Sequence, residues 1–184
     1  HHLHTIIEEV MEEYKELSGR VIGSVQTHRT AKADYLILTA GHVFQQVKNT
    51  VDQLRTQDKM KIGCLNLSLL RPFPEKELAA ALKGAKVVLV LEGYSGQEQG
   101  DAPLFKEVKA ALSGISKKAP KLLSTLYGHS FSSESLKVLV KNRIQKKEAI
   151  DRIFLDVDFT RDSSALPQHE LLLQSIRRAY PDIS

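Results

Sequence analysis

The chain has 184 residues, of which 42% are hydrophobic and 26% are charged, and its formal net charge is +4. These values are typical of one ordinary globular domain, and they exclude a disordered or collagen-like chain. No apolar run approaches the roughly 18 residues that a membrane-spanning helix needs, and the N-terminus lacks the basic and then apolar profile of a secretory signal. The single cysteine, Cys64, excludes an internal disulfide and a cysteine-based cluster, so we expect a cytoplasmic protein.

Charge is unevenly distributed along the chain. The first stretch is acidic, whereas eight basic side chains and only one acidic residue, Glu134, lie between Lys117 and Lys147. Such segments are typical of solvated faces on surface helices, and a docking surface is the alternative interpretation. The basic segment lacks the interleaved aromatic residues of a groove that binds single strands, so we expect no nucleic-acid partner.

A leading amphipathic helix is predicted over residues 1–20. Thr5 and Glu8 have the spacing of a capping box, and apolar residues recur at helical intervals until Ser18 and Gly19 interrupt them. The apolar residues are Ile6, Ile7, Val10, Met11, Tyr14 and Leu17. Residues 20–33 are mostly polar and show no clear periodicity.

Short apolar runs then alternate with longer amphipathic segments, as in a parallel α/β sheet. The runs 35–38, 62–67 and 87–91 are too continuously apolar for strands with one face in water, so we expect them to be central strands. Helices are predicted between them, over residues 43–54 and 75–82, because their apolar residues fall on one helical face.

The same alternation continues towards the C-terminus. We expect a helix opening at Pro103, a strand near 122–126, a helix over 133–144, a strand over 153–157 and a final helix that Pro181 ends. No internal repeat and no linker rich in Gly, Ser or Pro divides the chain. The predicted fold is therefore α/β, a mainly parallel open sheet with helices on both faces.

Ligands of open parallel sheets usually bind beyond the carboxyl ends of the strands, so the residues that follow each predicted strand are the candidates for a site. These residues include His42, Arg71, Glu92 and Tyr127. If they converge, they form an anion-binding or acid–base site. The alternative is a structural role, such as a hydrogen bond from His42 at the start of a helix.

The segment 93–100 is a glycine-containing loop between a predicted strand and a predicted helix, with candidate phosphate-binding glycines at Gly93, Gly96 and Gly100. It matches neither the Walker pattern nor the dinucleotide fingerprint, and Asp101 is predicted to cap the following helix. No nucleophile elbow is present, and Cys64 lies in an apolar run where its thiol is expected to be buried and inert. We therefore predict no catalytic residue and no metal ligand in this chain.

Several motifs resemble those of one enzyme family. The segment 61–65 followed by 70–74 reads Lys-Ile-Gly-Cys-Leu and Leu-Arg-Pro-Phe-Pro, and 100–108 reads Gly-Asp-Ala-Pro-Leu-Phe-Lys-Glu-Val. Tyr127 and Gly128 precede a serine-rich helix start. Together these motifs resemble landmarks of the 2-oxoacid:ferredoxin oxidoreductases, typified by pyruvate:ferredoxin or pyruvate:flavodoxin oxidoreductase. The similarity runs from about residue 8 to 130 and covers the domain that is similar to the transketolase C-terminal domain.

The resemblance implies that the whole enzyme carries out oxidative decarboxylation of pyruvate or a related 2-oxoacid, with ferredoxin or flavodoxin as its partner. In the family, thiamine diphosphate is held by other domains, and the iron–sulfur clusters lie in ferredoxin-like modules or partner subunits. We expect none of these cofactors on this chain, because it has no Gly-Asp-Gly thiamine signature and no cysteine cluster. Arg71 carries over from the family pattern, whereas His42 and Gly93 stand where the family usually has serine and arginine.

We therefore expect a non-catalytic α/β domain that serves assembly and active-site architecture in contact with other domains or subunits. The expected organisation is a leading helix over 1–20, a transketolase C-terminal-like domain over 21–130 and a C-terminal extension over 131–184 packed on the same domain. The alternative is a stand-alone module with the same fold. Such a module would dock a partner through its acidic first helix or basic later segment, or bind an anion through His42, Arg71 and the 93–100 loop.

Overall fold

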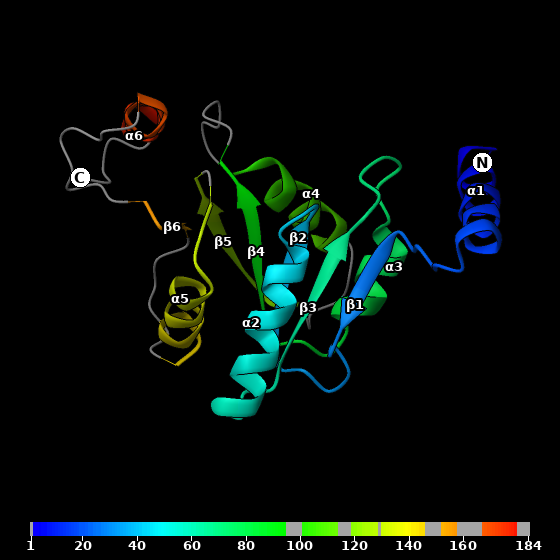
Figure 1. Ribbon diagram of the computed structural model, residues 1–184, viewed down its shortest axis with the longest axis horizontal. Helices are drawn as coiled ribbons and strands as arrows, with labels where there is room; N and C mark the ends of the chain where they lie inside the picture. Colours follow the sequence, from blue (N-terminus) through cyan, green and yellow to red (C-terminus); the bar gives the residue numbers. More distant parts are fainter. Residues whose placement is uncertain are drawn as a thin grey trace.

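The computed structural model describes residues 2–94, 101–113, 119–128, 130–145, 152–157 and 167–179. Their elements, in chain order, are α1 (His2–Ser18), β1 (Val25–His28), β2 (Tyr35–Ala40), α2 (Phe44–Gln57), β3 (Ile62–Leu67), α3 (Glu75–Leu82), β4 (Val87–Gly93), α4 (Pro103–Ser113), β5 (Lys121–Tyr127), α5 (Ser133–Gln145), β6 (Arg152–Leu155) and α6 (Pro167–Ala179). The strands form one sheet in the order β1-β3-β2-β4-β5-β6 (Figure 1).

The sheet is parallel from β3 to β6, which confirms the predicted fold class. Every residue of β3 is buried, and the middle of β2 and of β4 is buried as well. Burial on both faces is what the continuous apolar runs predicted, because helices cover both sides of a parallel sheet. In the register of the central strands, Ile37 of β2 lies between Cys64 of β3 and Leu89 of β4.

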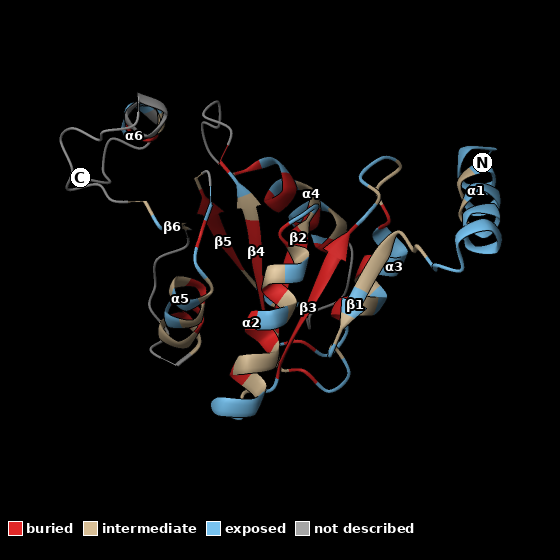
Figure 2. Cartoon of the chain, in the orientation of Figure 1, coloured by how far each residue is buried: buried red, intermediate tan, exposed pale blue. Residues whose placement is uncertain are grey.

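Each face of the sheet has its own apolar core, visible as the buried segments in Figure 2. On one face, α2 and α5 cover the sheet, and the fully buried Val47, Val51 and Leu54 of α2 pack with Leu136 of α5. On the other face, α3 and α4 pack on the sheet through their own apolar residues, including Leu78, Leu82, Phe105 and Val108. The helices predicted over 43–54 and 75–82 therefore lie on opposite faces.

Strand β1 lies in the segment where the sequence showed no periodicity, and it was not predicted. It runs antiparallel to β3 at the edge of the sheet, with His28 opposite Cys64. The chain then turns tightly enough to place the Arg29 carbonyl over Gly63, where an added Cβ would lie 2.5 Å from that oxygen. Side chains secure the turn, since Asp52 Oδ1 accepts a hydrogen bond from Arg29 Nε at 2.5 Å and lies 3.0 Å from His28 Nε2.

Helix α1 confirms the predicted leading helix but begins earlier than the capping-box spacing suggested. It starts at His2, so Thr5 lies inside the helix and is not its N-cap. It ends where Gly19 adopts a positive φ of 68° and donates its N–H to the Lys15 carbonyl at 2.8 Å. None of its residues is buried, and Figure 1 shows it standing apart from the sheet.

The last elements extend the sheet beyond β5. Strand β6 pairs parallel with β5, so that Leu155 lies opposite Tyr127, and Asp156 follows it with a positive φ of 54°. The strand predicted over 153–157 is therefore shorter at its C-terminal end. Helix α6 buries Leu173 and Ile176, whereas Pro181 lies outside the described residues. Among the described helices, none has the length and apolar character needed to cross a membrane.

Candidate functional site

The strand order places a topological switch point between β2 and β4. The chain leaves β2 towards β3 on one side, and it later returns to β4 on the other side of β2. In open α/β sheets the crevice outside the carboxyl ends at such a point is the usual ligand site. Here it is a pocket of about 470 Å³, lined at the strand ends by Ala40, Glu92 and Gly93. We call this cavity the switch-point pocket.

Arg71 reaches the switch-point pocket from the loop that follows β3. Its guanidinium makes two hydrogen bonds to neighbouring protein atoms: Nη2 donates to Glu107 Oε1 at 2.7 Å, and Nη1 donates to the Leu70 carbonyl at 2.7 Å. The side chain is 70% exposed, so this ion pair lies at the mouth of the pocket rather than in its interior. Glu107 belongs to α4, and the pair therefore links the β3–α3 loop to that helix.

Glu92 lies near the end of β4 and holds the start of α4. Its Oε2 accepts a hydrogen bond from the Leu104 N–H at 2.8 Å, and its Oε1 accepts one from the Phe105 N–H at 3.1 Å. Helix N-termini bind anions because their first N–H groups have no intrahelical partner. The carboxylate of Glu92 takes the place that a phosphate or another anion would occupy there, so these two amides are not open to an anionic ligand.

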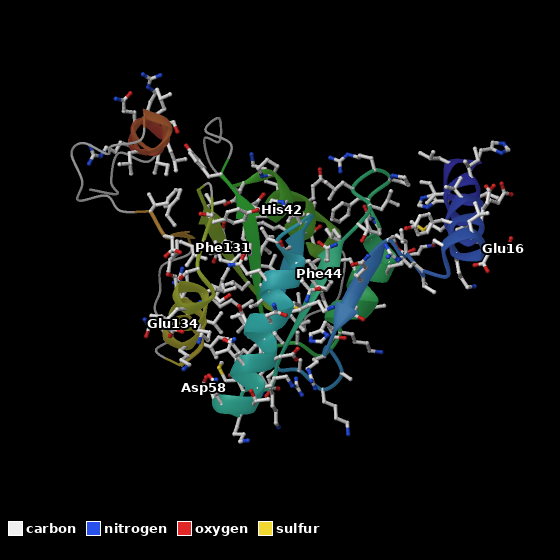
Figure 3. All side chains as sticks on the ribbon, viewed as in Figure 1. Glu16, His42, Phe44, Asp58, Phe131 and Glu134 are labelled. Atoms are coloured by element: carbon white, nitrogen blue, oxygen red, sulfur yellow. The ribbon has the colours of Figure 1, made fainter. Side chains whose placement is uncertain are left out.

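The other predicted site residues do not join this pocket. His42 is exposed on the turn before α2, as Figure 3 shows, and it is not one of the pocket-lining residues. Tyr127 packs on the α2 face of the sheet, with its ring 5.0 Å from the Phe131 ring. Burial raises the pKa of Tyr127, and the charge of Glu92 raises it further. Of the four residues, only Arg71 and Glu92 line the switch-point pocket.

The glycine loop contributes one described residue to the site. Gly93 ends β4 and lines the switch-point pocket, whereas Gly96 and Gly100 lie outside the described residues. Asp101, which was predicted to cap α4, accepts a hydrogen bond from Lys109 at 3.2 Å, and the Leu104 and Phe105 amides bond to Glu92 instead. Glu107 was not predicted as a site residue, because its only signal in the sequence was its place in the motif over residues 100–108.

The structure confirms that the Cys64 thiol is buried. It is fully buried on β3, and burial raises its pKa to about 12, with the Lys48 charge opposing and the Asp52 charge adding to the rise. A thiol with such a pKa is not a nucleophile near neutral pH. It is also no ligand for an iron–sulfur cluster, which needs several cysteine thiolates.

The described residues do not fit the other cofactors that the resemblance implies. A metal ion that anchors a diphosphate needs a cluster of oxygen or nitrogen ligands, and within the described ranges no group of three or more His, Cys, Asp and Glu residues could hold one. The amides at the start of α4, which could receive a phosphate, carry the Glu92 carboxylate. The described residues therefore provide neither a cluster of such ligands nor free amides at the start of α4 for a diphosphate.

Comparison with known proteins shows which family this chain belongs to. The family described as pyruvate:ferredoxin oxidoreductase core domain II matches residues 33–136, which is more than half of the chain. Pyruvate synthase subunit PorA of Thermotoga maritima is 32% identical over 123 residues, which are 67% of this chain and 31% of that protein. PorA of Methanothermobacter thermautotrophicus is 33% identical over 107 residues, covering 58% of this chain and 27% of that protein.

One further relative and one solved structure have different names. Pyruvate-flavodoxin oxidoreductase of Nostoc sp. is 30% identical over 121 residues, covering 65% of this chain and 30% of that protein. A solved 2-oxoglutarate:ferredoxin oxidoreductase from Magnetococcus marinus covers 77% of this chain and 23% of its own, with 18% identity and a TM-score of 0.48. The chain spans about a third of the length of the curated relatives it matches. It belongs to the pyruvate:ferredoxin oxidoreductase core domain II family and is thus a domain of the 2-oxoacid:ferredoxin oxidoreductase type.

Proposed function

We propose that this chain is a non-catalytic domain within a 2-oxoacid:ferredoxin oxidoreductase, where it serves assembly and shapes the approach to an active site formed elsewhere. The whole enzyme would oxidatively decarboxylate pyruvate or a related 2-oxoacid in the cytoplasm and pass electrons to ferredoxin or flavodoxin. Thiamine diphosphate, iron–sulfur clusters and coenzyme A would be bound by other domains or subunits. The family membership and the greater length of the relatives support this proposal.

One observation carries the non-catalytic assignment: the charged groups of the switch-point pocket are bonded to protein partners within the chain. Arg71 pairs with Glu107, and Glu92 accepts from two backbone amides. A catalytic acid, base or electrophile needs a proton or a charge that it can direct at a substrate. The hydrogen bonds of Glu92 and the ion pair of Arg71 with Glu107 therefore support a structural role for these groups.

The same contacts explain how the domain would shape its surroundings. Glu92 fixes the first turn of α4 to the end of β4, and Arg71 fixes the loop after β3 to the middle of α4. These bonds therefore connect the three segments that line the pocket: the end of β4, helix α4 and the loop after β3. A pre-organised edge of this kind suits a surface that positions another domain, because little side-chain freedom is lost on contact.

An anion-binding module has less support from this geometry. The α4 amides already hold a carboxylate, and the pocket contains two carboxylates against one guanidinium. A phosphate entering it would meet excess negative charge. Titration calorimetry with inorganic phosphate on the wild type and on Arg71→Ala tests this alternative. We expect neither form to bind phosphate. Binding to the wild type that Arg71→Ala abolishes would support the anion-binding module instead.

The proposed division into residues 1–20, 21–130 and 131–184 also remains a prediction. Helix α5 packs with α2, and β6 extends the sheet, so the segment after residue 130 contributes to the same core. Limited proteolysis followed by mass spectrometry would test whether cleavage separates these three parts.

The proposed function is tested on the native protein. Its intact mass, its co-purifying subunits and its 2-oxoacid-dependent reduction of ferredoxin are measured together, beside the isolated 184-residue chain. We expect a larger polypeptide or complex that reduces ferredoxin with coenzyme A and pyruvate or another 2-oxoacid, and an isolated chain without activity. A free native chain of 20.6 kDa without partners would overturn the proposal.

A further inference from the structure

The apolar side of α1 has no covering partner within the described structure. Five large apolar side chains lie along this helix at helical spacing, and their exposed fractions are 55% for Leu3, 53% for Ile6, 56% for Val10, 38% for Tyr14 and 82% for Leu17. We call these five residues the α1 stripe. A continuous exposed apolar surface of this kind is typical of an interaction site, whereas single exposed apolar residues are ordinary.

The other residues that the structure describes do not cover this stripe. No residue of α1 is buried, and the helix stands beyond the β1 edge of the sheet in Figure 1. The family match begins at residue 33, after α1 and β1, so the helix lies outside the matched residues. A helix of 17 residues without tertiary packing is only marginally stable in water, because most helical stability in proteins comes from packing an amphipathic face.

The charges beside the stripe indicate the chemistry of its partner. Helix α1 carries five glutamates, at positions 8, 9, 12, 13 and 16, and its only lysine, Lys15, is paired with Glu12 at 2.5 Å. Figure 3 shows Glu16 among the side chains that project from α1 into solvent. A second copy of α1 would bring glutamates against glutamates, which disfavours self-pairing. A groove with an apolar floor and lysine or arginine at its rim would instead complement both features.

We propose that the α1 stripe docks into such a basic-rimmed apolar groove on a part of the oxidoreductase that lies outside this chain. This inference rests on the proposed function. It is supported by the length of the relatives, since the matched region is only 31% of the Thermotoga maritima subunit and 30% of the Nostoc enzyme. Enzymes of that size contain ample further polypeptide to receive a helix. Docking would make α1 the element that fixes this domain in the larger assembly.

Hydrogen exchange measured by mass spectrometry tests the proposal on two samples: the isolated 184-residue chain and the complete native enzyme. We expect the amides of residues 2–18 to exchange at nearly unprotected rates in the isolated chain, and to be protected by roughly 100-fold or more in the enzyme. Zero-length carbodiimide cross-linking of the enzyme should join α1 glutamates to lysines outside the 184 residues. Equal exchange of α1 in both samples overturns the inference.

A matched pair of variants in the complete enzyme separates docking from general effects. Val10→Asn alters the stripe, whereas Val21→Asn alters another exposed valine, 76% exposed and outside the helix. We expect the first variant to remove most of the α1 protection and the second to leave it unchanged. Equal behaviour of the two variants contradicts the proposal.

The readouts also separate this inference from the proposed function. An active multidomain enzyme with unprotected α1 amides overturns the docking inference alone. A native chain of 20.6 kDa without oxidoreductase activity overturns the proposed function, and it also overturns the docking inference, which rests on that function. Protection of α1 in the isolated chain that rises with protein concentration identifies a second copy as the occupant, which also overturns the inference.

Discussion

Glu92 illustrates how one side chain determines what a site is able to bind. Its two carboxylate oxygens accept from the Leu104 and Phe105 amides, so the strongest local attraction for an anion is satisfied inside the chain. Pro103, the first residue of α4, has no N–H to offer. The residue that looked like a candidate acid or base therefore serves as the cap of a helix.

Glu92→Gln tests this capping role. The amide keeps one acceptor oxygen but loses the negative charge next to the helix N-terminus, so we expect the free energy of unfolding to fall by about 0.5–2 kcal/mol. Urea denaturation at neutral pH measures the change. The matched control is Glu107→Gln, which breaks only the exposed ion pair with Arg71 and should cost less than about 1 kcal/mol. A larger loss in the control than in Glu92→Gln would contradict this interpretation.

Gly63 is the residue where the backbone leaves no room for a side chain. A Cβ there would lie 2.5 Å from the Arg29 carbonyl oxygen and 2.8 Å from its carbon. Gly63→Ala should therefore displace the β1–β2 turn and lower the free energy of unfolding by about 1–3 kcal/mol. Gly23→Ala is the control, because its nearest neighbour lies at an ordinary 3.5 Å. Equal denaturation midpoints for both variants would show that the turn shifts without cost.

Asp52 gives the chain a predictable response to acid. Burial alone would raise its pKa, but the hydrogen bonds and charges of His28 and Arg29 outweigh burial and lower the pKa below its usual value of 3.8. A carboxyl with a depressed pKa in the folded state stabilises the fold above its unfolded pKa, and this contribution is lost as the pH falls through the folded pKa. We expect wild type to be more stable than Asp52→Asn at about pH 6 and the difference to shrink below about pH 3. Urea denaturation across this range measures it, and a constant difference would contradict the assignment.

At the scale of elements, the strands and helices that have a clear apolar pattern were predictable from the sequence. Strand β3 was predicted with its observed bounds, because all six residues of 62–67 are buried between two helical layers. Strand β1 was missed because Gln26, Thr27 and His28 form a short polar edge strand, held by pairing with β3 rather than by its own pattern. The candidate site was only partly predictable for a related reason: which strand ends lie side by side depends on strand order, which no local pattern encodes, so the sequence did not show that Arg71 and Glu92 line one pocket without His42.

The contrast between α1 and α2 predicts where stability resides. Deletion of residues 1–18 removes a helix with no buried residue, so the free energy of unfolding should change by less than about 0.5 kcal/mol. Leu54→Ala in α2 removes a fully buried side chain from the core and should cost about 2–5 kcal/mol. Urea denaturation of both variants makes the comparison. A substantial loss on deleting α1 would mean that the helix packs on the domain in solution.

At the scale of the whole molecule, the described residues form one α/β sheet covered by helices, and we propose that thiamine diphosphate binds outside this chain. We therefore expect thiamine diphosphate with Mg²⁺ to leave the thermal midpoint of the isolated chain unchanged, because a ligand raises the midpoint only when it binds the native state. Differential scanning calorimetry over a series of cofactor concentrations measures this. The complete native enzyme serves as the control and should show a rise. A concentration-dependent rise in the isolated chain would contradict the expectation.

The reversed direction of β1 has a consequence for how the domain faces its neighbours. Because β1 runs opposite to β3, its first residue, Val25, lies beside Leu67, at the carboxyl end of that parallel strand. The carbonyl of the preceding Ser24 accepts hydrogen bonds from the N–H groups of Ser68 and Leu69, just beyond that end, and so anchors the connection from α1 there. A parallel β1 would begin at the opposite rim. A single strand reversal thus brings the projecting helix to the rim that holds the switch-point pocket, so that one neighbour could engage both.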